Sequence, residues 1–215
     1  MGKIVVFGAG GRAGRRVVAE AAGRGHEVTA VVRDPGKHGG LAREGVAVVA
    51  GDVTDAASVA AAAAGHDAAV QAAARMDVPS EEFYAAAARA LVEGLSRAGV
   101  RRLVAIGIGS LLEVSPGIRL ADTPGFPRDA RAFSLGHGAE LPVYEQSDLD
   151  WVVLAPPPVF LDEVAERTGR YRIGDGRVPE PAEGEPVFSF ADLAVAVVDE
   201  AGGGAHHRAQ VAVSS

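Results

Sequence analysis

The chain has 215 residues, 48% hydrophobic and 23% charged, which is the composition of a soluble globular protein with a substantial core. The absence of cysteine excludes disulfides, thiolate catalysis and thiolate metal ligands, and the net charge of -7 argues against a nucleic-acid partner. No apolar run approaches the roughly 20 residues that span a bilayer, and the first residues lack a signal-like core, so we expect a cytoplasmic protein without a membrane partner.

Strand and helix patterns alternate along the chain. Apolar or β-branched runs predict strands at residues 3–7, 26–32, 46–50, 68–72, 102–106, 151–154 and 210–213. Helical patterns fill the gaps at 12–23, 56–64, from 80 onward, within 128–148, and from a cap at Ser189 and Asp192 to about Ala201. Because strands separated by helices form βαβ units, we expect an α/β Rossmann fold, a doubly wound parallel sheet in a single domain over residues 1–215.

Two segments interrupt this alternation. Residues 112–128 contain three prolines and two glycines, which predicts a long loop. A second break covers 156–186, where a short strand at 171–173 is expected outside the main sheet. Both segments follow strands whose carboxyl ends face one edge, where open parallel sheets bind ligands. We therefore expect loops at about 108–128 and 156–186 to form a small C-terminal substrate region.

A glycine-rich turn, GAGGRAG at residues 8–14, lies between the first strand and the first helix. The glycines are Gly8, Gly11 and Gly14, spaced three apart, with Gly10 between the first two. Such a turn needs one residue that tolerates unusual dihedrals, one without a side chain beside a pyrophosphate, and one that permits close contact between helix and sheet. The pattern and its strand-turn-helix setting predict dinucleotide binding, although a tight βα turn alone would also favour glycine.

The end of the second strand, VVRDPGK, bears on which dinucleotide is bound. A carboxylate there accepts hydrogen bonds from the adenosine ribose, whereas an arginine pairs with a 2′-phosphate. Arg33 follows the strand directly, while Asp34 precedes Pro-Gly and suits a turn, so we favour NADP(H) over NAD(H). A solvent-exposed charge is the alternative for Arg33. Asp52 and Val53, just past the third strand, are expected near the adenine, although Asp52 could instead cap a helix.

Six segments in this order carry a resemblance that covers nearly the whole chain: GAGGRAG, VVRDP, GDVTD, AGVRRLVAIG, DTPGFP and SDLDWVVLAPP. They resemble the NmrA-like, biliverdin reductase B-like branch of atypical short-chain dehydrogenases/reductases, a branch that includes NAD(P)H-flavin reductases. The resemblance implies NADP(H) binding by Gly8, Gly11, Arg12, Ala13, Gly14, Arg33, Asp52 and Val53. It implies a nicotinamide site near Ala72, Ala73, Ala74 and Pro156. Gly10 replaces the threonine that is usual in the family's first motif, which should preserve the turn.

The tyrosine-lysine pair of ordinary short-chain reductases is missing. Its lysine follows the tyrosine by four residues, whereas the only lysines here are Lys3 and Lys37. This absence favours an acceptor that delocalises its own charge, such as a flavin, a quinone or a conjugated ketone, over an isolated ketone. We therefore expect an NADP(H)-dependent oxidoreductase acting on a planar conjugated small molecule. The alternative is a non-catalytic NADP(H)-binding redox sensor or regulatory protein.

Candidate catalytic groups are Ser110 and Tyr144. Ser110 stands near the position of a serine that many relatives use beside the nicotinamide, but a turn or cap would also explain it. Tyr144 and His137 could face the cleft, although amphipathic helix surface is the simpler account of both. No metal is expected, since His206 and His207 lack a third ligand at a sensible spacing.

Overall fold

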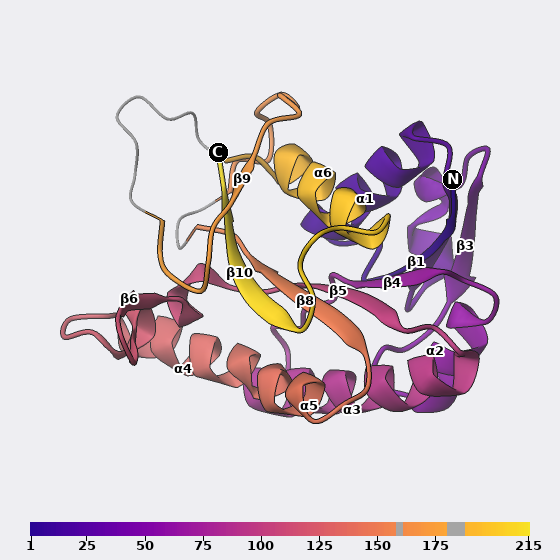
Figure 1. Cartoon of the computed structure of the whole chain (residues 1–215). Helices are drawn as coiled ribbons and strands as arrows, with labels where there is room; N and C mark the ends of the chain where they lie inside the picture. Colours follow the sequence, from indigo (N-terminus) through magenta and orange to yellow (C-terminus); the bar gives the residue numbers. More distant parts are fainter. Residues whose placement is uncertain (158–160, 180–187) are drawn as a thin grey trace.

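The computed structural model describes residues 1–157, 161–179 and 188–215, and its centre is an eight-stranded sheet (Figure 1). Its strand order is β3-β2-β1-β4-β5-β8-β10-β9, and all pairings are parallel except that of β9 with β10. The strands are β1 (Lys3–Phe7), β2 (Glu27–Val32), β3 (Val46–Ala50), β4 (Ala68–Gln71), β5 (Arg102–Ile106), β8 (Asp150–Ala155), β9 (Arg172–Ile173) and β10 (Ala209–Ser214). The order reverses between β1 and β4, which opens a crevice at their carboxyl ends. The predicted Rossmann α/β fold is confirmed.

Helices cover both faces of the sheet (Figure 1). Helices α1 (Arg12–Gly23) and α6 (Phe190–Ala201) pack together on one face, and α2 (Ala56–Ala63), α3 (Ser80–Ala98), α4 (Arg128–His137) and α5 (Leu141–Glu145) cover the other. Short 3-10 helices occupy Pro35–Lys37, Gly39–Leu41, Gly109–Leu111, Leu120–Asp122 and Gly138–Glu140. Across the described ranges, no helix combines the length and apolar character needed to cross a membrane.

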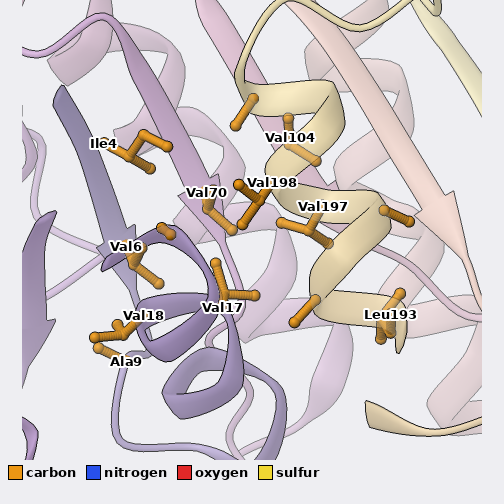
Figure 2. Packing of buried hydrophobic residues seen from close by; sticks show 14 of the residues in the cluster. Ile4, Val6, Ala9, Val17, Val18, Val70, Val104, Leu193, Val197 and Val198 are labelled. Atoms are coloured by element: carbon orange, nitrogen blue, oxygen red, sulfur yellow. The ribbon is translucent and has the colours of Figure 1, made fainter. Parts of the chain in front are cut away.

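The core has two layers because successive side chains of a strand point to opposite faces. Ile4 and Val6 of β1 lie in a cluster with side chains of α1 and α6, several of which Figure 2 labels. Val5 and Phe7 enter a second cluster with side chains of α3. Burial on both faces explains why the strands are almost continuously apolar. The sheet is thus a fixed platform, and the turns at its carboxyl edge carry the site.

The structure corrects two of the expected irregular segments. Residues 112–128 are not one long loop, because β6 (Glu113–Ser115) and β7 (Ile118–Arg119) form an antiparallel pair that turns at Gly117, with φ +76°. The short strand near 171–173 is not outside the main sheet either, because β9 pairs antiparallel with β10 at the sheet edge. The predicted cap of α6 is confirmed, since the Ser189 hydroxyl accepts from the Asp192 amide at 2.9 Å. Residues 158–160 and 180–186 of the second expected loop lie outside the described residues.

The opposite edge, where the parallel strands begin, holds a buried charged network. Arg102, the first residue of β5, is 8% exposed, and its Nη2 lies 2.6 Å from Oε2 of Glu200, which is 3% exposed. Arg102 also donates to the main-chain carbonyls of Glu200 and His206 at 3.0 and 2.9 Å. His206 Nδ1 lies 2.7 Å from the second Glu200 oxygen. The network joins the end of α6, and the turn that leads into β10, to β5.

Candidate functional site

A cavity of about 490 Å³ opens at the carboxyl ends of β1 and β4, where the strand order reverses. Its walls come from the turns after β1, β2, β3, β4 and β5, together with residues of α3, α4 and α6. Twelve of the residues singled out in the sequence line it: Gly8, Gly10, Gly11, Arg12, Ala13, Arg33, Asp52, Val53, Ala72, Ala73, Ala74 and His137. The structure therefore brings together side chains from four separate predicted turns.

The geometry of the glycine loop leaves no room for side chains at two positions. Gly8 has φ +76°, and a Cβ there would lie 2.4 Å from the main-chain N and Cα of Ala73. A Cβ on Gly14 would lie 2.2 Å from the Gly8 carbonyl oxygen. Gly8 thus permits the turn and its contact with β4, and Gly14 lets α1 pack directly against the loop.

The N-terminus of α1 is open toward the cavity. Its N-cap residue, Gly11, offers no side chain, and no acidic residue occupies the first turn. Among the described residues, the amides of Arg12, Ala13 and Gly14 have no hydrogen-bond partner. Free amides at a helix N-terminus, together with the helix dipole, form a binding site for an anion such as a pyrophosphate. The residues present therefore fit a dinucleotide.

An acidic side chain already lies against this helix terminus. Glu163 Oε1 is 3.0 Å from Arg12 Nη1, and its second oxygen is 3.4 Å from Arg15 Nη2. Arg16 donates to the Glu163 carbonyl oxygen. The Arg12 guanidinium also lies over the Phe190 ring, 5.6 Å from its centroid. The segment around Glu163 is thus held close to the cavity by ion pairs and a hydrogen bond from α1, while the cation-π contact joins Arg12 to α6.

The two charged residues after β2 have different surroundings. Arg33 lines the cavity, as do His38 and Arg75. Asp34 instead accepts from the Gly36 amide at 3.1 Å and lies 3.5 Å from the Lys37 ammonium. Its carboxylate is therefore occupied within its own turn, as the sequence predicted.

Asp52 is held within the turn after β3. Its Oδ1 accepts from the amide and hydroxyl of Thr54 at 2.9 and 2.7 Å. Partial burial opposes its ionisation, but the bonds from Thr54 and the nearby arginines outweigh it, so the pKa of Asp52 lies below its usual value. The helix cap that follows is supplied by Asp55, which accepts from the Ala57 amide at 2.8 Å.

Phe83 and Tyr84 of α3 and His137 of α4 form an aromatic wall of the cavity. Tyr84 and His137 stack with their ring centroids 3.8 Å apart and an interplanar angle of 9°. Phe83 meets Tyr84 edge to face at 5.2 Å. Gln71 makes two bonds with the main chain of Ala73, at 3.1 and 3.2 Å, which fix the turn after β4 that also lines the cavity. The rings of the aromatic wall offer a largely apolar surface to a ligand.

The two expected catalytic residues do not line the cavity. Tyr144 is fully buried against Trp151, and its hydroxyl donates to Glu140 Oε2 at 3.3 Å. The Ser110 hydroxyl lies 2.7 Å from that of Ser134, which itself donates to a carbonyl oxygen and so accepts from Ser110. These positions do not support the roles expected for Ser110 and Tyr144, because both hydroxyls are occupied inside the core.

Gly14 and Pro156 also lie outside the cavity lining. Gly14 sits under the glycine loop, in the packing position that its spacing predicted. Pro156 is buried directly after β8 and was expected beside the nicotinamide. Sequence reasoning missed other lining residues, namely His38, Arg75, Phe83, Tyr84, Ile106, Gly107 and Phe190. The sequence did contain a signal for Tyr84. This residue lies in the first turns of the helix that follows β4, and those turns begin close to the carboxyl edge of the sheet.

Comparisons with known proteins agree with this geometry. A family model described as NAD(P)H-binding matches residues 8–201. The Bacillus subtilis protein YwnB, itself uncharacterised, is 37% identical over 202 residues, which is 92% of this chain and 91% of its own. A Burkholderia pseudomallei structure described as a candidate exported protein is 40% identical, with a TM-score of 0.87 and full coverage of both chains.

A Streptococcus pneumoniae structure described as a candidate NADH-flavin reductase is 26% identical, with a TM-score of 0.85 and 99% coverage of both chains. The family match and the identity to these relatives extend over almost the entire chain, including the glycine loop and the cavity walls. Together they confirm the recognition made from the sequence motifs: the chain belongs to the NAD(P)H-binding family.

Proposed function

We propose that this protein is an NADP(H)-dependent reductase that acts on a planar conjugated acceptor such as a flavin, a quinone or a conjugated ketone. The main support for the proposal is that one cavity is lined both by the open N-terminus of α1 and by the aromatic residues Phe83 and Tyr84. The first feature suits a pyrophosphate, and the second suits a flat apolar ligand. The similarity to a protein described as a candidate NADH-flavin reductase supports the same class of reaction.

When bound, the reduced nicotinamide supplies a hydride, and water supplies the proton that completes the reduction. The chain contributes binding and positioning. The amides of Arg12 and Ala13 would hold the pyrophosphate, while Asp52 and Val53 would border the adenine. The turn that begins at Ala72 would lie beside the nicotinamide, and the aromatic wall would exclude water from the acceptor.

Arg33 is the residue on which the choice of NADP(H) rests. It lines the cavity, as do Arg75 and His38, and the charges of Arg33 and Arg75 both act on the carboxylate of Asp52. A 2′-phosphate would gain charge-assisted hydrogen bonds there, which a 2′-hydroxyl cannot match. The competing carboxylate of Asp34 is bonded within its turn.

The Arg33→Ala variant should therefore bind NADPH about 10- to 100-fold more weakly, since a hydrogen bond to a charged group contributes about 1.5–3 kcal/mol. NADH affinity should change by less than about twofold, because no 2′-phosphate is present. Isothermal calorimetry with both nucleotides measures the difference. Lys37→Ala is the matched control, since its exposed ammonium pairs with Asp34 outside the cavity lining. An unchanged NADPH affinity in Arg33→Ala would overturn the assignment.

Glu163→Gln should bind NADPH about two- to fivefold more tightly. The Glu163 carboxylate forms an ion pair with Arg12. An exposed ion pair of this kind contributes about 0.2–1 kcal/mol of stability, which is lost if an incoming pyrophosphate displaces the carboxylate. Glu166→Gln is the control, because Glu166 is a nearby exposed carboxylate outside the cavity lining. Calorimetry at low salt, where the ion pair is least screened, gives the clearest comparison. Equal affinities for both variants and the unmodified protein would show that Glu163 does not compete.

The proposed function is tested by following NADPH absorbance with the purified protein and a panel of flavins, quinones and conjugated ketones. Acceptor-dependent oxidation that requires the protein is the expected result. Calorimetric titration with NADPH runs in parallel. Tight binding without oxidation by any acceptor would contradict the reductase and favour the redox sensor.

A further inference from the structure

Tyr84 is a nearly buried side chain whose polar atom has no partner. The residue is 3% exposed and lines the cavity. Its hydroxyl makes no hydrogen bond with any described residue, and unlike the ring nitrogens of His137 it is not sealed from solvent. Since a buried hydroxyl normally finds a partner, an unpaired one at a cavity wall points to a bonding partner that enters the cavity.

The ring of Tyr84 is fixed by its neighbours. His137 covers one face at 3.8 Å, and Phe83 and Phe133 meet the ring edge to face with centroids 5.2 and 6.3 Å away. Three aromatic contacts from α3 and α4 hold the side chain in a single position. A hydroxyl held in this way donates to a ligand without the cost of ordering a mobile side chain.

We propose that the Tyr84 hydroxyl donates a hydrogen bond to a carbonyl oxygen of the acceptor, and that the acceptor is therefore a planar conjugated carbonyl compound. This inference rests on the proposed function and names the substrate class within it. The hydrogen bond strengthens as negative charge develops on that oxygen during reduction, so Tyr84 acts as a catalytic residue. The proton that completes the reduction still comes from water, and Tyr84 keeps its own.

The electrostatic surroundings suit a donor. Burial, and then the negative charge of Glu140, raise the pKa of Tyr84 above its usual value, so the hydroxyl remains protonated. Glu140 is 2% exposed and accepts a hydrogen bond from the Tyr144 hydroxyl. Its carboxylate is therefore fixed behind the aromatic wall. No lysine is needed to hold Tyr84, because aromatic packing does so.

Tyr84→Phe removes one oxygen and keeps the ring contacts. We expect unchanged NADPH affinity and an unchanged melting temperature, since no hydrogen bond within the protein is lost, and a fall in kcat of about 100-fold with menadione, a naphthoquinone. Tyr144→Phe is the matched control, because Tyr144 is the other buried tyrosine near the Glu140 carboxylate. It should lower the melting temperature, because it removes a buried bond, and leave kcat unchanged.

A second measurement does not depend on turnover. Infrared spectra of menadione bound to the protein with NADP+ should show a carbonyl band at lower frequency than in free menadione. The band should return to the free value in Tyr84→Phe and stay shifted in Tyr144→Phe. A band identical in the unmodified protein and Tyr84→Phe, an absence of menadione binding, or an unchanged kcat would overturn the proposal. A shifted band without NADPH oxidation would uphold the contact and contradict the proposed function instead.

Discussion

The Gly14→Ala variant should lose most of its affinity for NADPH, about 10- to 100-fold, and lose about 1–3 kcal/mol of stability through overpacking. The added methyl group would lie 2.2 Å from the Gly8 carbonyl oxygen, so α1 and the loop must separate. Separation moves the free amides of Arg12 and Ala13 away from the position that a pyrophosphate would occupy. Calorimetry and thermal denaturation measure the two effects.

Gly23→Ala provides a control within the same helix. Gly23 is the last residue of α1, and a Cβ there meets no atom within 4 Å. Because alanine is a better helix former than glycine, this variant should gain up to about 1 kcal/mol and keep its NADPH affinity. If Gly14→Ala kept the NADPH affinity and the stability of Gly23→Ala, the close contact at Gly14 would not be required for the nucleotide site.

Glu200→Ala should cost about 3–5 kcal/mol of folding free energy, the largest effect on stability that we expect. The substitution removes the buried partner of the Arg102 guanidinium, 8% exposed, and leaves it only the more exposed carboxylate of Asp150 at 3.2 Å. It also removes the bond from His206, which helps to hold the turn before β10. Chemical denaturation measures the loss, and the surviving folded protein should bind NADPH normally because the network lies at the opposite edge of the sheet.

Two further variants separate charge burial from a general effect of the substitution. Glu93→Ala removes a carboxylate from an exposed pair with Arg97 on α3 and should change stability by less than about 0.5 kcal/mol. The double variant Arg102→Met with Glu200→Leu should recover much of the loss, because no unpaired buried charge remains. A loss in the double variant as large as that of Glu200→Ala would contradict this explanation.

The sequence was sufficient for those parts of the site that depend on local geometry. A turn that needs positive φ at Gly8 and close packing at Gly14 is encoded within a few residues. The turn role of Asp34 was equally predictable, since its bond to the Gly36 amide is local. The alternation of strands and helices likewise predicted a doubly wound parallel sheet, whereas its strand order came from the structure.

The aromatic wall could not be predicted in the same way. Tyr84 and Tyr144 both lie on helices that pack against the sheet, and both are nearly or fully buried. Only the packing of α4 beside α3 decides that Tyr84 borders a cavity while Tyr144 faces Trp151. Periodicity identifies a buried helix face, but it does not distinguish a core from a cavity wall.

The short strands were predicted only in part: β6 and β7 were missed, whereas β9 was expected, but outside the main sheet. Strand β7 has two residues, too few for a recognisable alternation, and β9 forms only through its pairing with β10, far along the chain. Pairing across such a distance is a tertiary contact, which outweighs local preference in short segments.

The most direct test of the account is a single-turnover reaction with NADPH that carries deuterium at the transferable C4 position. The protein would be mixed with this nucleotide and menadione, and the reduced product would be trapped and analysed by mass spectrometry and NADP+ absorbance. The account predicts stoichiometric NADP+, formed more slowly than from unlabelled NADPH, with Tyr84→Phe slower still. NADPH that remains unoxidised while fully bound, or oxidation without a deuterium isotope effect in a reaction limited by chemistry, would contradict hydride transfer in this cavity.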